Sequence, residues 1–262
     1  MAMRQPFRIQ HRRRIGVALI VAVVLVAGGG LGLAWAGHHA AQPASVPGGR
    51  MAPADGNPGI IPSPGAASLR PATPAPAPSA DLVGLGWTSF YGVNLPVSRA
   101  AGPWHVHRGL AWGFADTPLG ALLAAVNIGV RANAQWGPGI FAPTIRAQVT
   151  GPGAPALLAS CQASYQQASQ AMSVPAGQPL GRAYVTEEAF RWVAYTPADA
   201  TVDIVSAGPG IQGTTARAVT RIEVVWAGGD WRVIAPPGGD WGNSAAPLAS
   251  LDGYTSFPAP PA

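Results

Sequence analysis

Lysine is absent from this 262-residue chain, in which all 16 basic residues are arginines and only 10% of residues are charged. Cysteine occurs once, at Cys161, so no disulfide can form within one chain. The folded part must therefore be held together by a hydrophobic core, and residues 84–258 are numerous enough to build one.

Acidic residues are missing from the first 36 positions, which carry five of the arginines. The other arginines equal the acidic residues in number, so the net charge of +5 arises entirely in this N-terminal segment. A basic surface on the folded part is the usual mark of a nucleic-acid-binding protein, and this chain does not have the composition for one. We therefore expect no direct binding of nucleic acid.

Residues 15–36 contain no charge and are long enough for a membrane-spanning helix, which takes about 20 residues. Under the positive-inside rule the basic tail, residues 1–14, stays cytoplasmic. We predict a single-pass protein of the cell membrane with an extracytoplasmic C-terminal domain. A signal peptide cleaved after Ala34-Trp35-Ala36 is the alternative, and it also places the domain outside the cytoplasm.

Large apolar residues are scarce in residues 37–83, where Pro, Ala, Gly and Ser dominate. Such a segment buries too little apolar surface to offset its ordering entropy, so we predict a disordered linker. The folded domain is expected at residues 84–258.

Two helices are predicted in this domain. The first has Thr117 as N-cap and Pro118 at its first position, and it ends near Trp136, before Gly137-Pro138-Gly139. The second runs from Pro155 to Met172. Its apolar residues are Leu157, Leu158, Cys161, Tyr165 and Met172. This position predicts a buried, inert thiol for Cys161.

Strand-like alternation begins after Gly181 and occupies residues 182–195, 200–206, 214–226 and 231–234. Gly228-Gly229-Asp230 predicts a tight hairpin between the last two strands. Residues 85–103 are expected to form an irregular strap over the core. The predicted fold class is α+β: a transmembrane helix, a disordered Pro/Ala linker, and a domain with two helices packed on a curved antiparallel sheet.

The segments GWTSFYGVNLPVS (86–98) and GFADTPLGALLAAVNIGVR (113–131) resemble a family of uncharacterised membrane proteins from actinomycete mobile elements. The resemblance implies an NTF2-like outer domain, similar in plan to bitopic assembly subunits of conjugal type IV secretion machines. It also implies a non-enzymatic scaffold that contacts the membrane and other channel subunits, with a homo-oligomer as a further possibility. This link is an analogy of fold and layout.

Chemically competent side chains are few, and we assign no catalytic, cofactor-binding or metal-binding residue. His105 and His107 would share one side of a strand but lack a third metal ligand, although His38-His39 lies in the linker. In an enzyme built on the pocket of this fold, Glu188 would be the inward-facing acid. Other polar residues considered are Glu187, Asp199, Asp203, Ser164 and Ser169, none of which has the sequence context of a catalytic group.

Eight of the nine tryptophans lie in the outer domain. An exposed row of them would form a glycan-stacking platform, so a carbohydrate-binding module of the cell envelope is the main alternative function. A small-ligand binder or enzyme is another alternative. One side of the first helix has the residues Gly120, Ala124, Asn127 and Arg131. This side is expected to form either an oligomer contact or a plain solvent-exposed surface.

Overall fold

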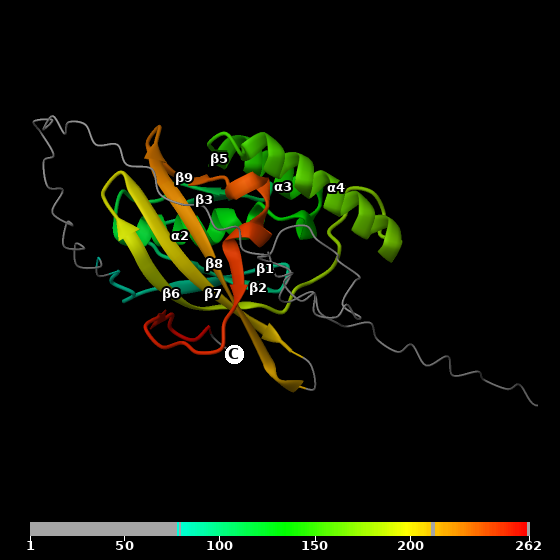
Figure 1. The fold of residues 1–262 in the computed structure, drawn as a ribbon. Coiled ribbons are helices and arrows are strands. Elements are labelled where there is room, and N and C mark those ends of the chain that lie inside the picture. The colour runs from blue at the N-terminus through cyan, green and yellow to red at the C-terminus, as the bar shows by residue number, and fades with distance from the viewer. Residues whose placement is uncertain (1–77, 79, 211–212, 261–262) are drawn as a thin grey trace, which may run out of the picture. The chain divides into compact units, whose positions relative to one another are not determined.

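The structure is a computed structural model that describes residues 78, 80–210 and 213–260. Its frame is a curved sheet with the strand order β1-β2-β6-β7-β8-β9-β5, to which β10 and β11 add at β8 and β6 (Figure 1). A separate two-stranded sheet is formed by β3 and β4. The strand bounds are β1 Gly86–Phe90, β2 Val93–Val97, β3 His105–His107, β4 Leu110–Trp112, β5 Val149–Thr150, β6 Thr186–Tyr195, β7 Asp199–Pro209, β8 Thr215–Ala227, β9 Asp230–Ile234, β10 Ala245–Pro247 and β11 Thr255–Ser256.

The antiparallel series β6 to β9 confirms the strands expected after Gly181. Side chains at alternate positions of β7 and β8, such as Val202, Ile204 and Ile222, are buried on one face, as their period of two predicts. Strands β8 and β9 are joined by the expected hairpin, where Gly228 and Gly229 both adopt positive φ.

Residues 86–97 form a regular hairpin, so the irregular strap expected over residues 85–103 is wrong for most of its length. β1 pairs with β2 through a two-residue turn in which Tyr91 and Gly92 have φ of 49° and 93°. This turn type matches the twist of paired strands. A side chain at Gly92 would also collide with the carbonyl oxygen of Ala183, which explains the glycine.

The described part of the chain contains three α-helices. They are α2 Pro118–Arg131, α3 Pro138–Gln148 and α4 Ala154–Met172, with a short 3-10 turn, η1, at Ala134–Trp136. The Thr117 side chain accepts a hydrogen bond from the Gly120 amide at 3.1 Å, which confirms the predicted N-cap. Pro138 stands in the first turn of α3, so the sequence expected to stop one helix also starts another.

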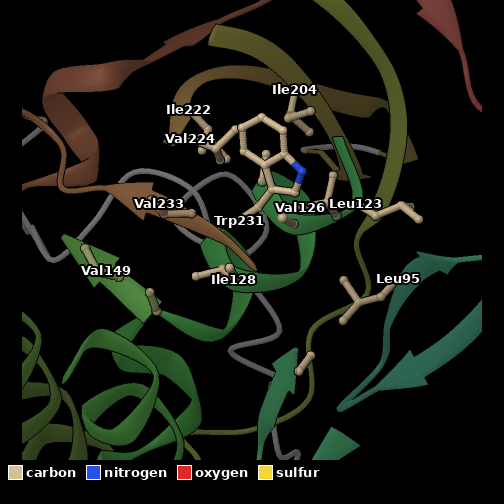
Figure 2. Close-up of a cluster of buried hydrophobic side chains, with 14 of the residues drawn as sticks. Leu95, Leu123, Val126, Ile128, Val149, Ile204, Ile222, Val224, Trp231 and Val233 are labelled. Atoms are coloured by element: carbon tan, nitrogen blue, oxygen red, sulfur yellow. The ribbon is translucent and has the colours of Figure 1, made fainter. Parts of the chain in front are cut away.

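Helix α2 crosses the concave side of the sheet and contacts β2, β7, β8 and β9. Helices α3 and α4 pack on each other. Helix α3 also contacts α2 and the strands β9 and β5, which form one end of the sheet (Figure 1). Between α2 and the sheet the Trp231 indole lies among branched aliphatic side chains from α2, β7, β8 and β9 (Figure 2). Burying such a cluster supplies most of the driving force for folding.

The C-terminal segment packs back on the domain. Two 3-10 turns, η3 Pro237–Gly239 and η4 Trp241–Ser244, follow β9. Trp241 and Phe257 are buried in the core. The chain then pairs with β8 through β10 and with β6 through β11, so it connects two strands that lie on either side of β7.

The expected fold class is therefore wrong in several respects, although its α+β class holds. The sheet is mixed, because β2–β6 and β5–β9 are parallel pairs, and three helices replace the expected two. Among the described residues no helix combines the length and hydropathy needed to span a membrane. The helix expected at residues 15–36, the tail 1–14 and most of the linker 37–83 lie outside the described residues.

Candidate functional site

A buried carboxyl group lies between α2 and the sheet. Glu187, on β6, is 2% exposed, and one of its oxygens accepts a hydrogen bond from the Ser206 hydroxyl of β7 at 2.7 Å. The surrounding side chains are Val126, Val130, Ile204, Ile222 and Trp241, none of which is charged. Burial raises the pKa of Glu187 to about 7, against the opposing effect of the Ser206 hydrogen bond.

Glu188, the acid expected to face inward, points to the other face of the sheet. Its carboxylate pairs with Arg217 of β8, with oxygen–nitrogen distances of 2.5 and 2.9 Å. The reason is a β-bulge: the register with β7 shifts between Glu187 and Ala189. Without this extra residue, strict alternation from the inward-facing Phe190 would have placed Glu188 inside.

The cavity beside Glu187 is small. Its volume is about 20 Å³, which is room for about one water molecule. Pockets for drug-sized ligands are about 300–1,000 Å³. The Glu187 carboxyl therefore has one hydroxyl partner and no adjacent space for a substrate.

Of the two aspartates considered, Asp199 is exposed and Asp203 is 3% exposed. Asp203 lies between Arg191 and Arg221 on the outer face of the sheet and pairs with both at 2.8 Å. Burial by itself would raise the pKa of Asp203, but the hydrogen bonds and charges of the two arginines outweigh burial and lower it.

The remaining polar candidates are not brought together into a site. His105 and His107 lie exposed on β3, and no group of three or more potential metal ligands occurs in the described ranges. Ser169 donates to the Gln166 carbonyl within α4, and Ser164 also lies on α4. Cys161 is buried as expected, and burial raises the pKa of its thiol to about 12, so it is unreactive.

The small-residue side of α2 is buried inside the domain. The expectations of an oligomer contact and of a solvent-exposed surface are therefore both wrong. Gly120, Ala124, Asn127 and Arg131 are all buried. The Asn127 amide donates to the Pro96 carbonyl at 3.0 Å. The Arg131 guanidinium donates to Asn127 and lies 4.6 Å from the Phe90 ring centre, and burial lowers the pKa of Arg131 to about 10.

Exposed apolar side chains lie on and next to the small sheet formed by β3 and β4, with Trp112 on the same face as His105 and Val106 on the opposite face. We call residues 104–112 the aromatic hairpin. Trp104, Val106 and Trp112 are 53%, 58% and 37% exposed, and the Trp112 and His105 rings stack at 5.3 Å. Tryptophan is among the side chains enriched where proteins contact other molecules.

The aromatic hairpin is fixed at its base by one carboxylate. Asp230, at the start of β9, accepts hydrogen bonds from the backbone amides of Gly113 and Phe114 at 2.8 and 2.9 Å. On the other side of the hairpin, the Gln148 side chain donates to the Ala111 carbonyl at 2.6 Å. Sequence patterns gave no signal for these contacts, because Asp230 is more than 100 residues from its partners.

Comparison with known proteins adds one relationship. No curated protein and no solved structure matches the chain. A family described as Domain of unknown function (DUF8175) matches residues 42–256, which include the aromatic hairpin, Glu187 and the Arg191–Asp203–Arg221 cluster. The chain belongs to this DUF8175 family.

Proposed function

We propose that this protein is a non-enzymatic scaffold whose domain binds other protein subunits through the aromatic hairpin. The observation that carries the proposal is the exposure of Trp104, Val106 and Trp112 in a hairpin whose base is hydrogen-bonded to the Asp230 carboxylate. Tryptophan is among the residues that contribute most binding energy at protein interfaces. The small volume of the cavity at Glu187 argues against an enzyme or small-ligand binder that uses the pocket beside this acid.

The setting of this scaffold remains a prediction from the sequence. A conjugal, type IV secretion-like apparatus is suggested only by the resemblance of residues 86–98 and 113–131. The predicted location in the cell membrane depends on residues 1–36, which lie outside the described residues. Channel subunits and a second copy of this chain are the partners that these predictions name.

Site-specific photocrosslinking in cells tests the proposal. A photoreactive phenylalanine analogue replaces Val106 in the full-length chain, and a matched control carries it at Met172, which is 53% exposed on α4. We expect position 106, and not position 172, to crosslink to a defined protein that mass spectrometry identifies as a secretion-channel subunit or a second copy. Equal crosslinking from both positions, or none from position 106, would contradict the proposal.

The glycan-binding alternative has one observation in its favour, the exposure of two tryptophans on the same hairpin. Indole rings stack on sugar faces as well as on protein side chains. In the same experiment, recovery of only peptidoglycan or other glycan fragments from position 106 would favour this alternative over a protein scaffold.

A further inference from the structure

A groove lies on the outer face of the sheet, and its lining includes no residue of the aromatic hairpin. Its volume is about 630 Å³, within the range of ligand pockets. Arg191, Asp203 and Arg221 line it from β6, β7 and β8, and the segment from Ala235 to Ala246 and Tyr254 line it from the C-terminal part of the chain. No sequence pattern indicated this groove, because its parts come from elements that are separate in the sequence.

The strand register places the three charged residues in one row. Arg191 is the direct partner of Asp203 on one side, and Arg221 is its direct partner on the other. The Asp203 side chain is 5% exposed, whereas those of Arg191 and Arg221 are 46% and 50% exposed. A molecule that enters the groove therefore meets the two guanidinium groups and not the carboxylate that holds them.

Both guanidinium groups keep unused donors. Arg191 gives Asp203 one N–H, from Nη2, and Arg221 gives it two, from Nε and Nη2. Each guanidinium carries five N–H donors in a planar fork, so most of them have no protein partner. The Tyr254 ring lies 4.5 Å from the Arg191 guanidinium carbon, which restrains this side chain further. Two pre-oriented forks of this kind match the geometry of a carboxylate.

One acidic residue limits what the groove accepts. Glu223 lies two residues after Arg221 on β8 and also lines the groove. Its negative charge contributes to raising the pKa of Arg221. A ligand with a dense negative charge would be repelled by Glu223, whereas a single carboxylate can be held by the arginines. The groove thus favours a singly charged carboxylate on a mostly neutral ligand.

We propose that this groove binds a ligand that carries a single carboxylate, with the carboxylate held between Arg191 and Arg221. A chain-terminal carboxylate and an acidic side chain share this chemistry, and the test separates the two. The proposal does not depend on the function of the aromatic hairpin, because the two surfaces share no residue.

Nuclear magnetic resonance titration of the ¹⁵N-labelled full-length chain tests this. The probes are acetyl-Gly-Gly-Gly with a free C-terminus, acetyl-Gly-Glu-Gly-amide, and the uncharged acetyl-Gly-Gln-Gly-amide. We expect the Nε–H resonances of Arg191 and Arg221 to shift and saturate with a carboxylate probe and to stay unchanged with the glutamine probe. The carboxylate probe that binds more tightly shows whether the groove prefers a C-terminal carboxylate or an acidic side chain. Equal effects of all three probes, or shifts that never saturate, would overturn the proposal.

Matched variants make the test specific. R191Q and R221Q are expected to weaken carboxylate binding at least fivefold, whereas R182Q, which removes an exposed arginine outside the groove, changes it less than twofold. E223Q leaves the Arg–Asp–Arg row intact and is expected to tighten binding at least twofold. Unchanged affinity in both R221Q and E223Q would show that the groove is not the binding site.

Discussion

At the scale of single residues, Glu187 places an ionisable group in unfavourable surroundings. Its carboxyl group is surrounded by apolar side chains and has only the Ser206 hydroxyl as a partner. Because the ionised form is disfavoured in such surroundings, Glu187 is a protonated, neutral group up to about pH 7. A neutral glutamine has nearly the same shape and needs no proton to remain uncharged.

Glu187→Gln should therefore change how stability depends on pH. The pKa of Glu187 is raised from 4.5 to about 7 on folding, so its unfavourable contribution is absent below pH 4.5, grows from pH 4.5 to about 7, and stays constant above. We expect the variant to be more stable than the wild type by up to about 3 kcal/mol at pH 8. At pH 4 the two should differ little. Urea unfolding at both pH values measures this, and parallel pH profiles would contradict it.

At the scale of elements, the aromatic hairpin depends on β9 for its position. Two amides at its base, those of Gly113 and Phe114, donate to Asp230, and the Trp231 indole donates to the Ala115 carbonyl at 2.9 Å. The hairpin itself buries little, since all three residues of β3 are exposed. Its order therefore comes from these contacts rather than from a core of its own.

Asp230→Ala should loosen the aromatic hairpin more than the rest of the domain. Loss of the charge-assisted hydrogen bonds from the Gly113 and Phe114 amides is expected to cost about 1–3 kcal/mol. Hydrogen exchange should accelerate at least tenfold at the Gly113 and Phe114 amides and remain near wild type in β7. Asp252→Ala, at an exposed position in the C-terminal segment, serves as the control. Uniform acceleration across the sheet would show that Asp230 supports the whole fold instead.

At the scale of the whole molecule, the C-terminal segment links distant parts of the fold. Trp241 donates to the Ala132 carbonyl at the end of α2, and β10 and β11 pair with β8 and β6. Phe257 is 6% exposed, and its ring centre lies 5.1 Å from that of Phe190 on β6 and 6.0 Å from that of Trp87 on β1. The end of the domain thus packs on its first strand.

Phe257→Ala should destabilise the entire domain. Truncation of a buried phenylalanine typically costs about 3–5 kcal/mol. We expect a single cooperative unfolding transition at lower temperature, with Ser256→Ala, at an exposed position of β11, within about 0.5 kcal/mol of the wild type. Thermal unfolding monitored by circular dichroism measures the shift. A wild-type transition in the Phe257 variant would mean that the C-terminal segment is dispensable.

Sequence patterns predicted the local elements of this domain well where the signal is itself local. The N-cap at Thr117, the length of α4, the alternation along β7 and β8 and the hairpin at Gly228 each depend on residues within a few positions of each other. Such preferences act before tertiary structure forms. The buried state of Cys161 followed from the same helical period.

What the sequence did not reveal is set by contacts between distant segments. Glu187 rather than Glu188 faces inward because of a bulge against β7. The small-residue side of α2 is buried because β2 and α3 pack against this helix. Helix α2 had the composition of a helix buried on all sides, a signal present in its run of Leu, Ala and Val.

The sequence by itself therefore determined the α+β class, most strands, two helices and the inert thiol, since short-range periodicity encodes them. Only the tertiary structure decided the mixed sheet, the inward acid, the exposed aromatic hairpin and the row Arg191–Asp203–Arg221. Each of these depends on which strands become neighbours and in what register. A one-residue shift moves every side chain to the opposite face, so period alone cannot fix them.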